Sequence, residues 1–320
     1  MMMSQAFHFN DFQFAPDINV IAGWRQWADA GSVSSGLIQY LIDQTQAVKI
    51  GTISPDGFYF FQIPGTHDLV RPVIKFETGL PRRLETPRNE FFYSGNVEHG
   101  LVLFLGDEPH LDGERYVSNI LEAAKLLHAR RIIGLGGVYG EFPYDKDRMI
   151  SAIYSQKQIK KELKPLAVNF SNYEGGASIE SYLCKRAGEQ KVWFAGLYAF
   201  VPSYEFTGDA QTVRTIRLEN DFTAWLNIMQ RVNYLLNLAI DLTDLEFRSQ
   251  QLHEAMRKEI EEIDRSSPEQ GVLENIKRIS EEFTEMRFAP SEDFWEEKLR
   301  GFFDRLEGDE SNDLTIRGSG

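Results

Sequence analysis

Two glycine-rich segments are the parts of this sequence best suited to hold a ligand. Residues 134–140 (Gly-Leu-Gly-Gly-Val-Tyr-Gly) follow an apolar run, and residues 172–179 contain Glu174, Gly175 and Gly176 at the start of a helical pattern. Backbone N–H groups in a glycine turn or at a helix N-terminus can bind a phosphate or a carboxylate. Both segments are therefore candidate anion sites, although a tight backbone turn is the simpler explanation of each.

Neither segment carries a nucleotide-binding fingerprint. The dinucleotide pattern requires glycine at position 139, where Tyr139 stands, and the residues after Gly140 do not begin a helix. The sequence contains no Gly-Lys-Ser or Gly-Lys-Thr, which excludes a P-loop.

A single acid, Asp29, follows the first apolar run at 18–24. It could cap a helix that begins near Ser32, or it could bind an amine or hydroxyl group of a ligand. Trp24 and Trp27 could line a pocket or fill a subunit contact. We take one set of residues as the candidate ligand pocket at the strand ends: Gly23, Trp24, Asp29, Gly136, Gly137, Glu174, Gly175 and Gly176.

No arrangement of side chains demands a particular reaction. The six histidines form neither His-x-His nor His-Glu-x-x-His, and Cys184 is the single cysteine, so we expect no multi-thiolate metal site and no disulfide within the chain. A Gly-x-Ser-x-Gly elbow is also lacking. We therefore assign no catalytic residue, no metal ion and no cofactor.

The candidate residues must be positioned by alternating strands and helices. Several apolar runs, notably 101–105, show no polar alternation, which predicts a sheet covered by helices on both faces. Strands are expected at 18–24, 47–54, 58–63, 70–77, 100–105, 131–137, 166–171 and 191–200. Helices are expected at 31–44, 113–128, 156–163, 177–187 and 216–240.

Two regions depart from this alternation. Residues 56–95 contain strand-like runs separated by prolines, which predicts an antiparallel excursion at the rim of a site or in an oligomer interface. Residues 243–310 hold 20 acidic against 10 basic residues and show a helical period, with a third helix expected at 292–306. We expect a main domain at 1–242, an acidic helical element at 243–307 and a disordered tail at 308–320. The narrow apolar stripe of the helical element is expected to pack on the main domain or on another copy.

Charge and hydropathy limit the partners. A net charge of −14 without a basic cluster argues against nucleic acid. The longest apolar run, residues 192–201, is about half the length of a membrane span. With no visible targeting signal and one cysteine, the chain is expected to be cytoplasmic.

The order of several short motifs resembles the proteasome assembly chaperone 2 family, in its bacterial type with a helical tail. The match extends over roughly 18–305. The motifs are Gly23-Trp24, Asp29-Ala-Gly31, Ser35-Gly36, Gly136-Gly137, Glu174-Gly-Gly-Ala-Ser-Ile179, Ala199-Phe-Val-Pro-Ser-Tyr204 and Ala289-Pro-Ser-Glu-Asp-Phe-Trp295. Two features depart from the family pattern: Ser203 stands where members often have histidine, and the chain does not end in the hydrophobic-Tyr-x tail of proteasome-docking relatives.

The resemblance implies a three-layer α/β/α sandwich with a mixed, largely parallel sheet, akin to nucleoside phosphorylases, with a C-terminal helical hairpin. It also implies assembly into homo-oligomers and a relation to assembly chaperones or scaffolds. Our first hypothesis is therefore a non-catalytic homo-oligomer, a trimer or higher, that binds another protein through its acidic helical tail. The alternative function is a small-molecule-binding enzyme, related to phosphorylases, hydrolases or ligases, that uses the pocket at the strand ends.

Overall fold

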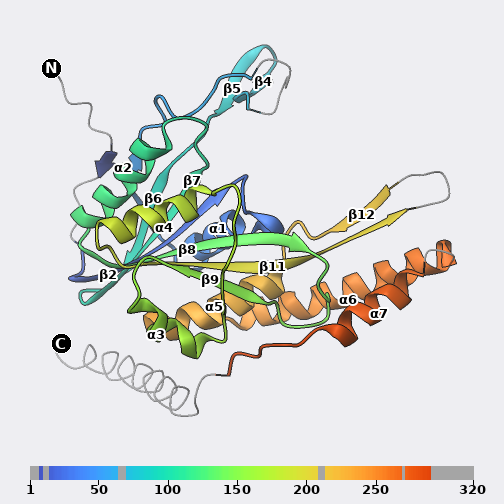
Figure 1. Cartoon of the computed structure of the whole chain (residues 1–320). Coiled ribbons are helices and arrows are strands. Elements are labelled where there is room, and N and C mark those ends of the chain that lie inside the picture. Colours follow the sequence, from blue (N-terminus) through green and yellow to red (C-terminus); the bar gives the residue numbers. More distant parts are fainter. Residues whose placement is uncertain (1–6, 10–13, 64–69, 208–212, 269–270, 290–320) are drawn as a thin grey trace, which may run out of the picture.

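The computed structural model describes residues 7–9, 14–63, 70–207, 213–268 and 271–289. Within them, ten strands form one sheet in the order β1-β3-β6-β7-β2-β8-β11-β9-β10, with β12 paired to β11 (Figure 1). The central strands β7, β2, β8 and β11 are parallel, and most of the outer pairings are antiparallel. The strands are β1 (Phe7–Phe9), β2 (Asp17–Arg25), β3 (Val48–Ile53), β6 (Glu90–Gly95), β7 (His99–Asp107), β8 (Ala129–Gly140), β9 (Ile150–Tyr154), β10 (Asn169–Phe170), β11 (Phe194–Thr207) and β12 (Val213–Arg217).

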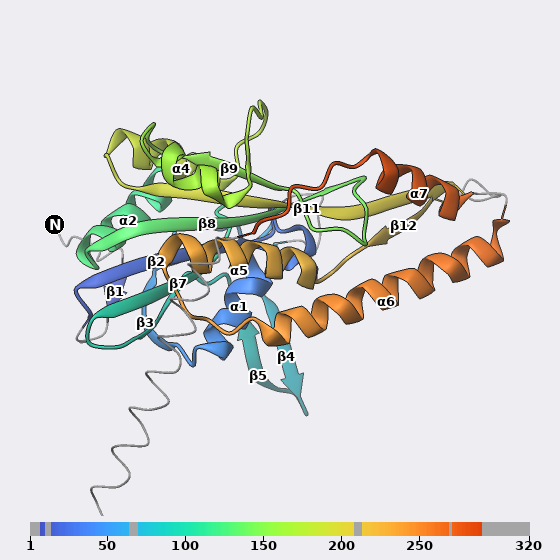
Figure 2. The same ribbon diagram turned by 90° about the horizontal axis from the view of Figure 1, so that it is seen from below.

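Helices cover both faces of this sheet (Figures 1 and 2). Successive side chains of a strand point to opposite faces, so Ile21 and Leu103 lie in one core while Val20 and Val102 lie in the other. The first core holds α1 (Ser35–Gln44), α3 (Ile159–Leu163), α5 (Phe222–Leu236), α6 (Thr243–Ser266) and α7 (Val272–Glu282), and the second holds α2 (Gly113–Leu126) and α4 (Ile179–Glu189). The predicted α/β/α sandwich with a mixed sheet is confirmed.

The strand expected at 131–137 forms and continues to Gly140 as β8, so the tight turn that the glycines of 134–140 suggest does not form. Its glycines allow neighbouring segments to pack directly against the backbone of the strand. A Cβ atom at Gly137 would lie 2.1 Å from the carbonyl oxygen of Ala30, and a Cβ atom at Gly134 would lie 2.4 Å from Oε1 of Glu180. The strand therefore has no side chain at the two positions where other segments, one on each face, come closest to its backbone.

The excursion after β3 contains a hairpin, and the prediction of a strand at 58–63 is wrong. Phe58 lies in the core, but residues 58–63 form turns and irregular backbone. Strands β4 (Val73–Glu77) and β5 (Leu80–Glu85) form a separate two-stranded antiparallel sheet. The short strands β1, β5, β6, β9 and β12 are not predicted from the sequence. The helix expected from 216 begins only at Phe222, because 213–217 pair with β11.

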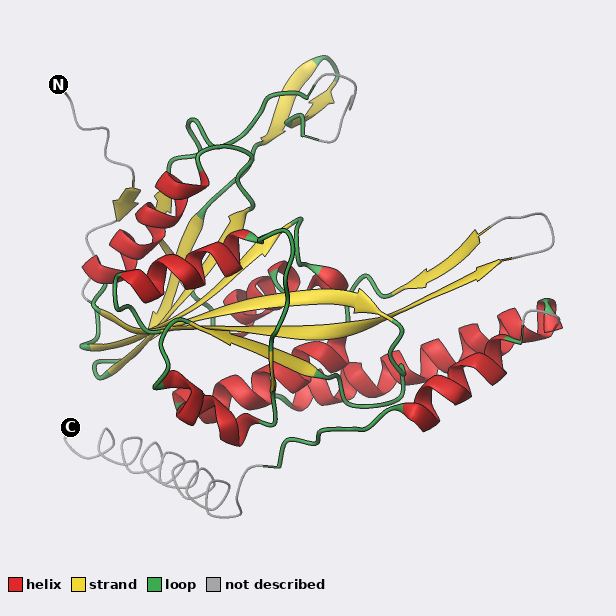
Figure 3. Ribbon diagram, viewed as in Figure 1, coloured by secondary structure: helices red, strands yellow, loops and turns green. Residues whose placement is uncertain are grey.

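The C-terminal helices α6 and α7 lie along the ribbon formed by β11 and β12 (Figures 2 and 3). Their apolar stripe, including Leu245, Met256, Ile260 and Ile276, is buried in the same core as α5. This stripe therefore packs on the chain's own main body, one of the two outcomes expected. The helix expected at 292–306 and the tail at 308–320 lie outside the described residues.

Candidate functional site

Asp29 lies at the N-terminus of α1 and caps it. Its Oδ1 accepts hydrogen bonds of 2.9 Å from the backbone N–H groups of Ser34 and Ser35, and its Oδ2 accepts one of 2.5 Å from the Ser35 hydroxyl. Burial raises the pKa of Asp29, although these hydrogen bonds and nearby Arg25 oppose the rise. An acid in this position satisfies helix N–H groups that would otherwise lack a partner.

Gly23 and Gly137 lie beside the same helix start, and the backbone N–H of Trp24 donates to the Ser34 hydroxyl at 2.7 Å. The Trp24 ring lies on the opposite face of the sheet, in the core that holds α2. A Cβ atom at Gly23 would lie 2.0 Å from the carbonyl oxygen of Ser34, so glycine lets α1 approach the strand. Trp24 is 2% exposed and its Nε1 donates to the Tyr116 hydroxyl at 3.1 Å. The backbone N–H of Gly137 donates to the Ala28 carbonyl at 2.7 Å.

The other predicted residues lie elsewhere. Gly136 faces Tyr198 from within β8. Glu174, Gly175 and Gly176 belong to an exposed loop that precedes α4. Among the described residues, no hydrogen bond connects Glu174 to Asp29. The structure thus gathers Gly23, Asp29, Gly137 and the backbone of Trp24 around the start of α1, and leaves the Trp24 ring on the other face of the sheet and the loop apart. Whether any of these residues binds a ligand stays a prediction.

A second polar cluster, which sequence reasoning missed, lies between the start of α4 and the sheet. It consists of Glu108, which follows β7, Ser178 and Glu180 at the start of α4, and Tyr198 of β11. Oε1 of Glu108 accepts from the backbone N–H of Ile179 at 2.9 Å. The hydroxyls of Ser178 and Tyr198 share a hydrogen bond of 3.3 Å.

Three glycines make the space that the Glu180 carboxyl occupies. Gly134 and Gly196 are register partners on β8 and β11, and a Cβ atom on either would lie within 2.4 Å of Glu180 Oε1. Gly136 lies beside them, and a Cβ atom there would lie 3.2 Å from Glu180 Oε2. Glycine at alternate positions of neighbouring strands is the signal that could have indicated a buried side chain packed flat on the sheet.

The surroundings of the Glu180 carboxyl favour its neutral form. It is 3% exposed, and burial raises its pKa to about 8, with Glu108 adding to the rise and a hydrogen bond with Tyr198 opposing it. Burial also raises the pKa of Glu108. Glu180 Oε1 and Glu108 Oε2 are buried without a hydrogen-bond partner among the described residues. A neutral carboxylic acid of this kind can donate a proton or a hydrogen bond.

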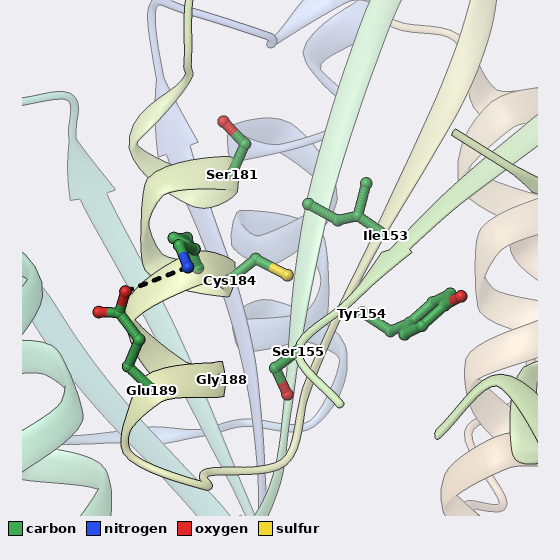
Figure 4. A pocket seen from close by; sticks show the side chains of 8 residues that line it. Ile153, Tyr154, Ser155, Ser181, Cys184, Gly188 and Glu189 are labelled. Atoms are coloured by element: carbon green, nitrogen blue, oxygen red, sulfur yellow. Dashed lines mark ion pairs between the residues drawn. The ribbon is translucent and has the colours of Figure 1, made fainter. Parts of the chain in front are cut away.

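A shallow hollow of about 510 Å³ adjoins this cluster between α4 and β9 (Figure 4). Its lining comprises Ile153, Tyr154, Ser155, Ser181, Cys184, Lys185, Gly188 and Glu189. Burial and the neighbouring Glu180 raise the pKa of the Cys184 thiol to about 12, which keeps the thiol protonated and unreactive. Lys185 and Glu189 form an ion pair of 3.1 Å at the rim.

The described residues hold no group of three or more His, Cys, Asp or Glu side chains suited to a metal ion. Across the same part of the chain, every helix is too short or too polar to cross a bilayer.

Comparison with known proteins identifies the family. The PAC2 family model matches residues 24–260, which is well over half of the chain. This chain belongs to the PAC2 family. The expected family relationship is thereby confirmed, and the match includes the Asp29 cap, the Glu180 cluster and most of α6.

Solved structures of other PAC2 relatives have the same fold. A proteasome-assembly chaperone homologue from Mycobacterium tuberculosis is 19% identical, with a TM-score of 0.64 over 75% of this chain and 94% of that chain. A PAC2 family protein from Streptomyces avermitilis is 20% identical, with a TM-score of 0.64 over 76% and 95%. PbaB from Pyrococcus furiosus, described as an archaeal proteasome activator, is 18% identical, with a TM-score of 0.54 over 79% and 97%. No curated protein sequence matches the chain significantly.

Proposed function

We propose that this PAC2 protein is a non-catalytic assembly factor that acts as a homo-oligomer, a trimer or larger, and binds other proteins. Membership of the family supports this role, as do structural relatives whose names describe a proteasome-assembly chaperone homologue and a proteasome activator. The observation that carries the proposal is the β4–β5 hairpin, whose eleven strand residues are all exposed and largely apolar or charged. An exposed group of apolar side chains such as this one is typical of protein interaction sites.

Three further expectations belong to this proposal. The acidic helices after 243 are a second contact surface for a protein partner. The net charge of −14 disfavours nucleic acid as that partner. A cytoplasmic location is consistent with the single cysteine.

Gentle isolation of the tagged full chain from its own cells, followed by native mass spectrometry, tests the proposal. We expect a species of three or more copies that carries a second protein at a fixed stoichiometry. A single copy without a partner at micromolar concentration would contradict it.

A second candidate function is small-molecule binding at the Glu180 cluster. One observation favours it: Glu180 presents a buried oxygen without a partner close to Glu108, which directly follows the parallel strand β7, and α/β folds bind ligands at the carboxyl ends of such strands. Nucleosides, nucleotides and inorganic phosphate should then raise the melting temperature of the wild-type chain but not of Glu180→Gln. Ligand at about 100 times its dissociation constant adds about 2.7 kcal/mol, so a lack of any shift at millimolar ligand would exclude this function.

A further inference from the structure

The β4–β5 hairpin lacks the support that such an element needs. Within the described residues, β4 and β5 pair with each other and with no other strand. The hairpin stands away from the sandwich (Figures 1 and 3). A two-stranded hairpin is at best marginally stable in water unless a further surface covers it. A further surface must therefore cover this hairpin if it is to be stable.

The hairpin is rich in exposed apolar side chains. On its two strands, Val73, Ile74, Phe76, Leu80 and Leu84 are between 49% and 62% exposed. The patch continues onto the preceding loop at Phe60, Phe61 and Ile63, which are 36% to 66% exposed, and the Arg71 guanidinium lies over the Phe61 ring at 5.3 Å.

The exposed apolar area is substantial. Eight side chains of roughly 150–200 Å² each, about half exposed, present on the order of 700 Å² in total. Because successive side chains of a strand point to opposite faces, this area is divided between the two faces of the hairpin, with Ile74 and Leu84 on one face and Val73 on the other. A single scattered apolar side chain is normal on a monomer, whereas a group of this extent is typical of an interaction site.

The hairpin is basic in an acidic molecule. Residues 71–88 hold five Lys or Arg and two Glu, whereas the whole chain has a net charge of −14. One of the five, Arg88, follows β5 and is paired with Glu90 at 3.8 Å. The two glutamates are paired within the hairpin, with Arg82 bound to Glu77 at 2.8 Å and Arg83 to Glu85 at 3.0 Å. A complementary surface must therefore be acidic, and a symmetric contact between two hairpins would place like charges together.

Helix α6 supplies such a surface on the same chain. It holds seven acidic and four basic residues. Its inner stripe is buried, but Glu246, Glu254 and Glu259 are exposed, and Phe247 on the outer side is 58% exposed. The basic residues are partly neutralised within the helix, as in the ion pair of Arg248 with Asp244 at 2.7 Å.

The hairpin and α6 lie at different ends of the molecule. The hairpin projects beyond α2 on one side of the sheet, and α6 extends with β12 on the other side (Figure 1). Contact between them is therefore a contact between copies. Such a head-to-tail contact is heterologous and generates a ring when the rotation closes.

We propose that the β4–β5 hairpin of one copy docks on the acidic outer face of α6 of a second copy, through its exposed apolar side chains and its surplus of basic residues. This inference depends on the proposed function, because it names the surfaces through which the chain self-associates.

Analytical ultracentrifugation of full-length variants tests the proposal. Ile74→Ser with Leu84→Ser, which are cross-strand partners, should weaken association roughly 100-fold because two apolar contacts are lost. Lys75→Glu with Arg83→Glu, the next pair along the hairpin, lies on its other face and should weaken association by the smaller factor of roughly tenfold, through the lost charge attraction rather than a lost contact. The matched control, Lys157→Glu with Lys161→Glu, reverses two exposed charges near α3 and should leave association unchanged. Circular dichroism checks that every variant is folded.

A rescue experiment tests the acceptor surface. The variant Glu246→Lys with Glu254→Lys should associate poorly alone, and mixing it with Lys75→Glu/Arg83→Glu should restore mixed oligomers. Unchanged association of the hairpin variants would overturn this proposal but leave the proposed function standing. Failure of the rescue would show that α6 is not the surface on which the hairpin docks. A wild-type chain that stays monomeric at 50 μM would instead overturn the proposed function itself.

Discussion

Replacement of Glu180 by glutamine tests whether the buried carboxyl is neutral in the folded chain. Its side chain lies in a slot left by Gly134 and Gly196. Burial, assisted by Glu108, raises its pKa from the ordinary value of 4.5 to about 8, against a hydrogen bond with Tyr198. Glutamine has nearly the same size and carries no charge, so it removes the titration and keeps the packing.

The expected effect on stability follows from proton binding. Between pH 4.5 and about 8 the folded chain keeps a proton on Glu180 that the unfolded chain releases. The free energy of unfolding therefore falls as the pH rises, by about 1.4 kcal/mol per pH unit for one group. The contribution is fully present below pH 4.5 and is lost near pH 8. From roughly pH 5 to pH 8 the loss amounts to about 4 kcal/mol.

Urea unfolding at several pH values measures this loss. We expect the stability of the wild-type chain, taken relative to Glu180→Gln, to fall by about 4 kcal/mol from pH 5 to pH 8. The matched control is Glu122→Gln, which changes an exposed glutamate of α2 and should follow the wild type. Parallel curves for wild type and Glu180→Gln would refute the reasoning, because they would show that Glu180 is ionised in both states.

Three other outcomes follow from the contacts. Asp29→Ala should lower the free energy of unfolding by about 1–2 kcal/mol, because the N-terminus of α1 loses its cap. Urea unfolding at pH 7 measures this loss, and an unchanged midpoint of the urea transition would contradict the capping role. Gly137→Ala should prevent soluble expression or lower the melting temperature sharply, because its Cβ would lie 2.1 Å from the Ala30 carbonyl, while Gly176→Ala, with open space around it, should express normally. Cys184 should react with iodoacetamide at pH 7.5 far more slowly in the folded than in the unfolded chain, because its thiol is buried and burial raises its pKa. Mass spectrometry follows the reaction, and equal rates in the two states would contradict this protection.

The layers of the fold could be predicted because their signals are local. The run at 101–105 is apolar at every position, and its residues divide between two cores in the structure. Asp29 ahead of a helical pattern likewise predicted a possible cap, and it is one. The strands that were missed are short, and β12 exists only through its pairing with β11, which no local pattern reveals.

The glycines of β8 show why the polar cluster was missed. A run such as 134–140 is typical of a turn, and only the close approach of Ala30 and Glu180 explains why it is a strand. Glu180 lies in a helical pattern that gives no sign of burial, since its environment comes from β8 and β11, with Glu108 following β7. The site therefore depends on contacts between segments that are distant in sequence.

We expect this PAC2 chain to work as a self-associated protein with exposed binding surfaces. Size-exclusion chromatography with light scattering on the purified, unmodified chain measures its mass in solution most directly. We expect a mass at least three times that of one chain, which is 36.8 kDa, at micromolar concentration. A single species at the mass of one chain, unchanged up to the highest concentration reached, would contradict it.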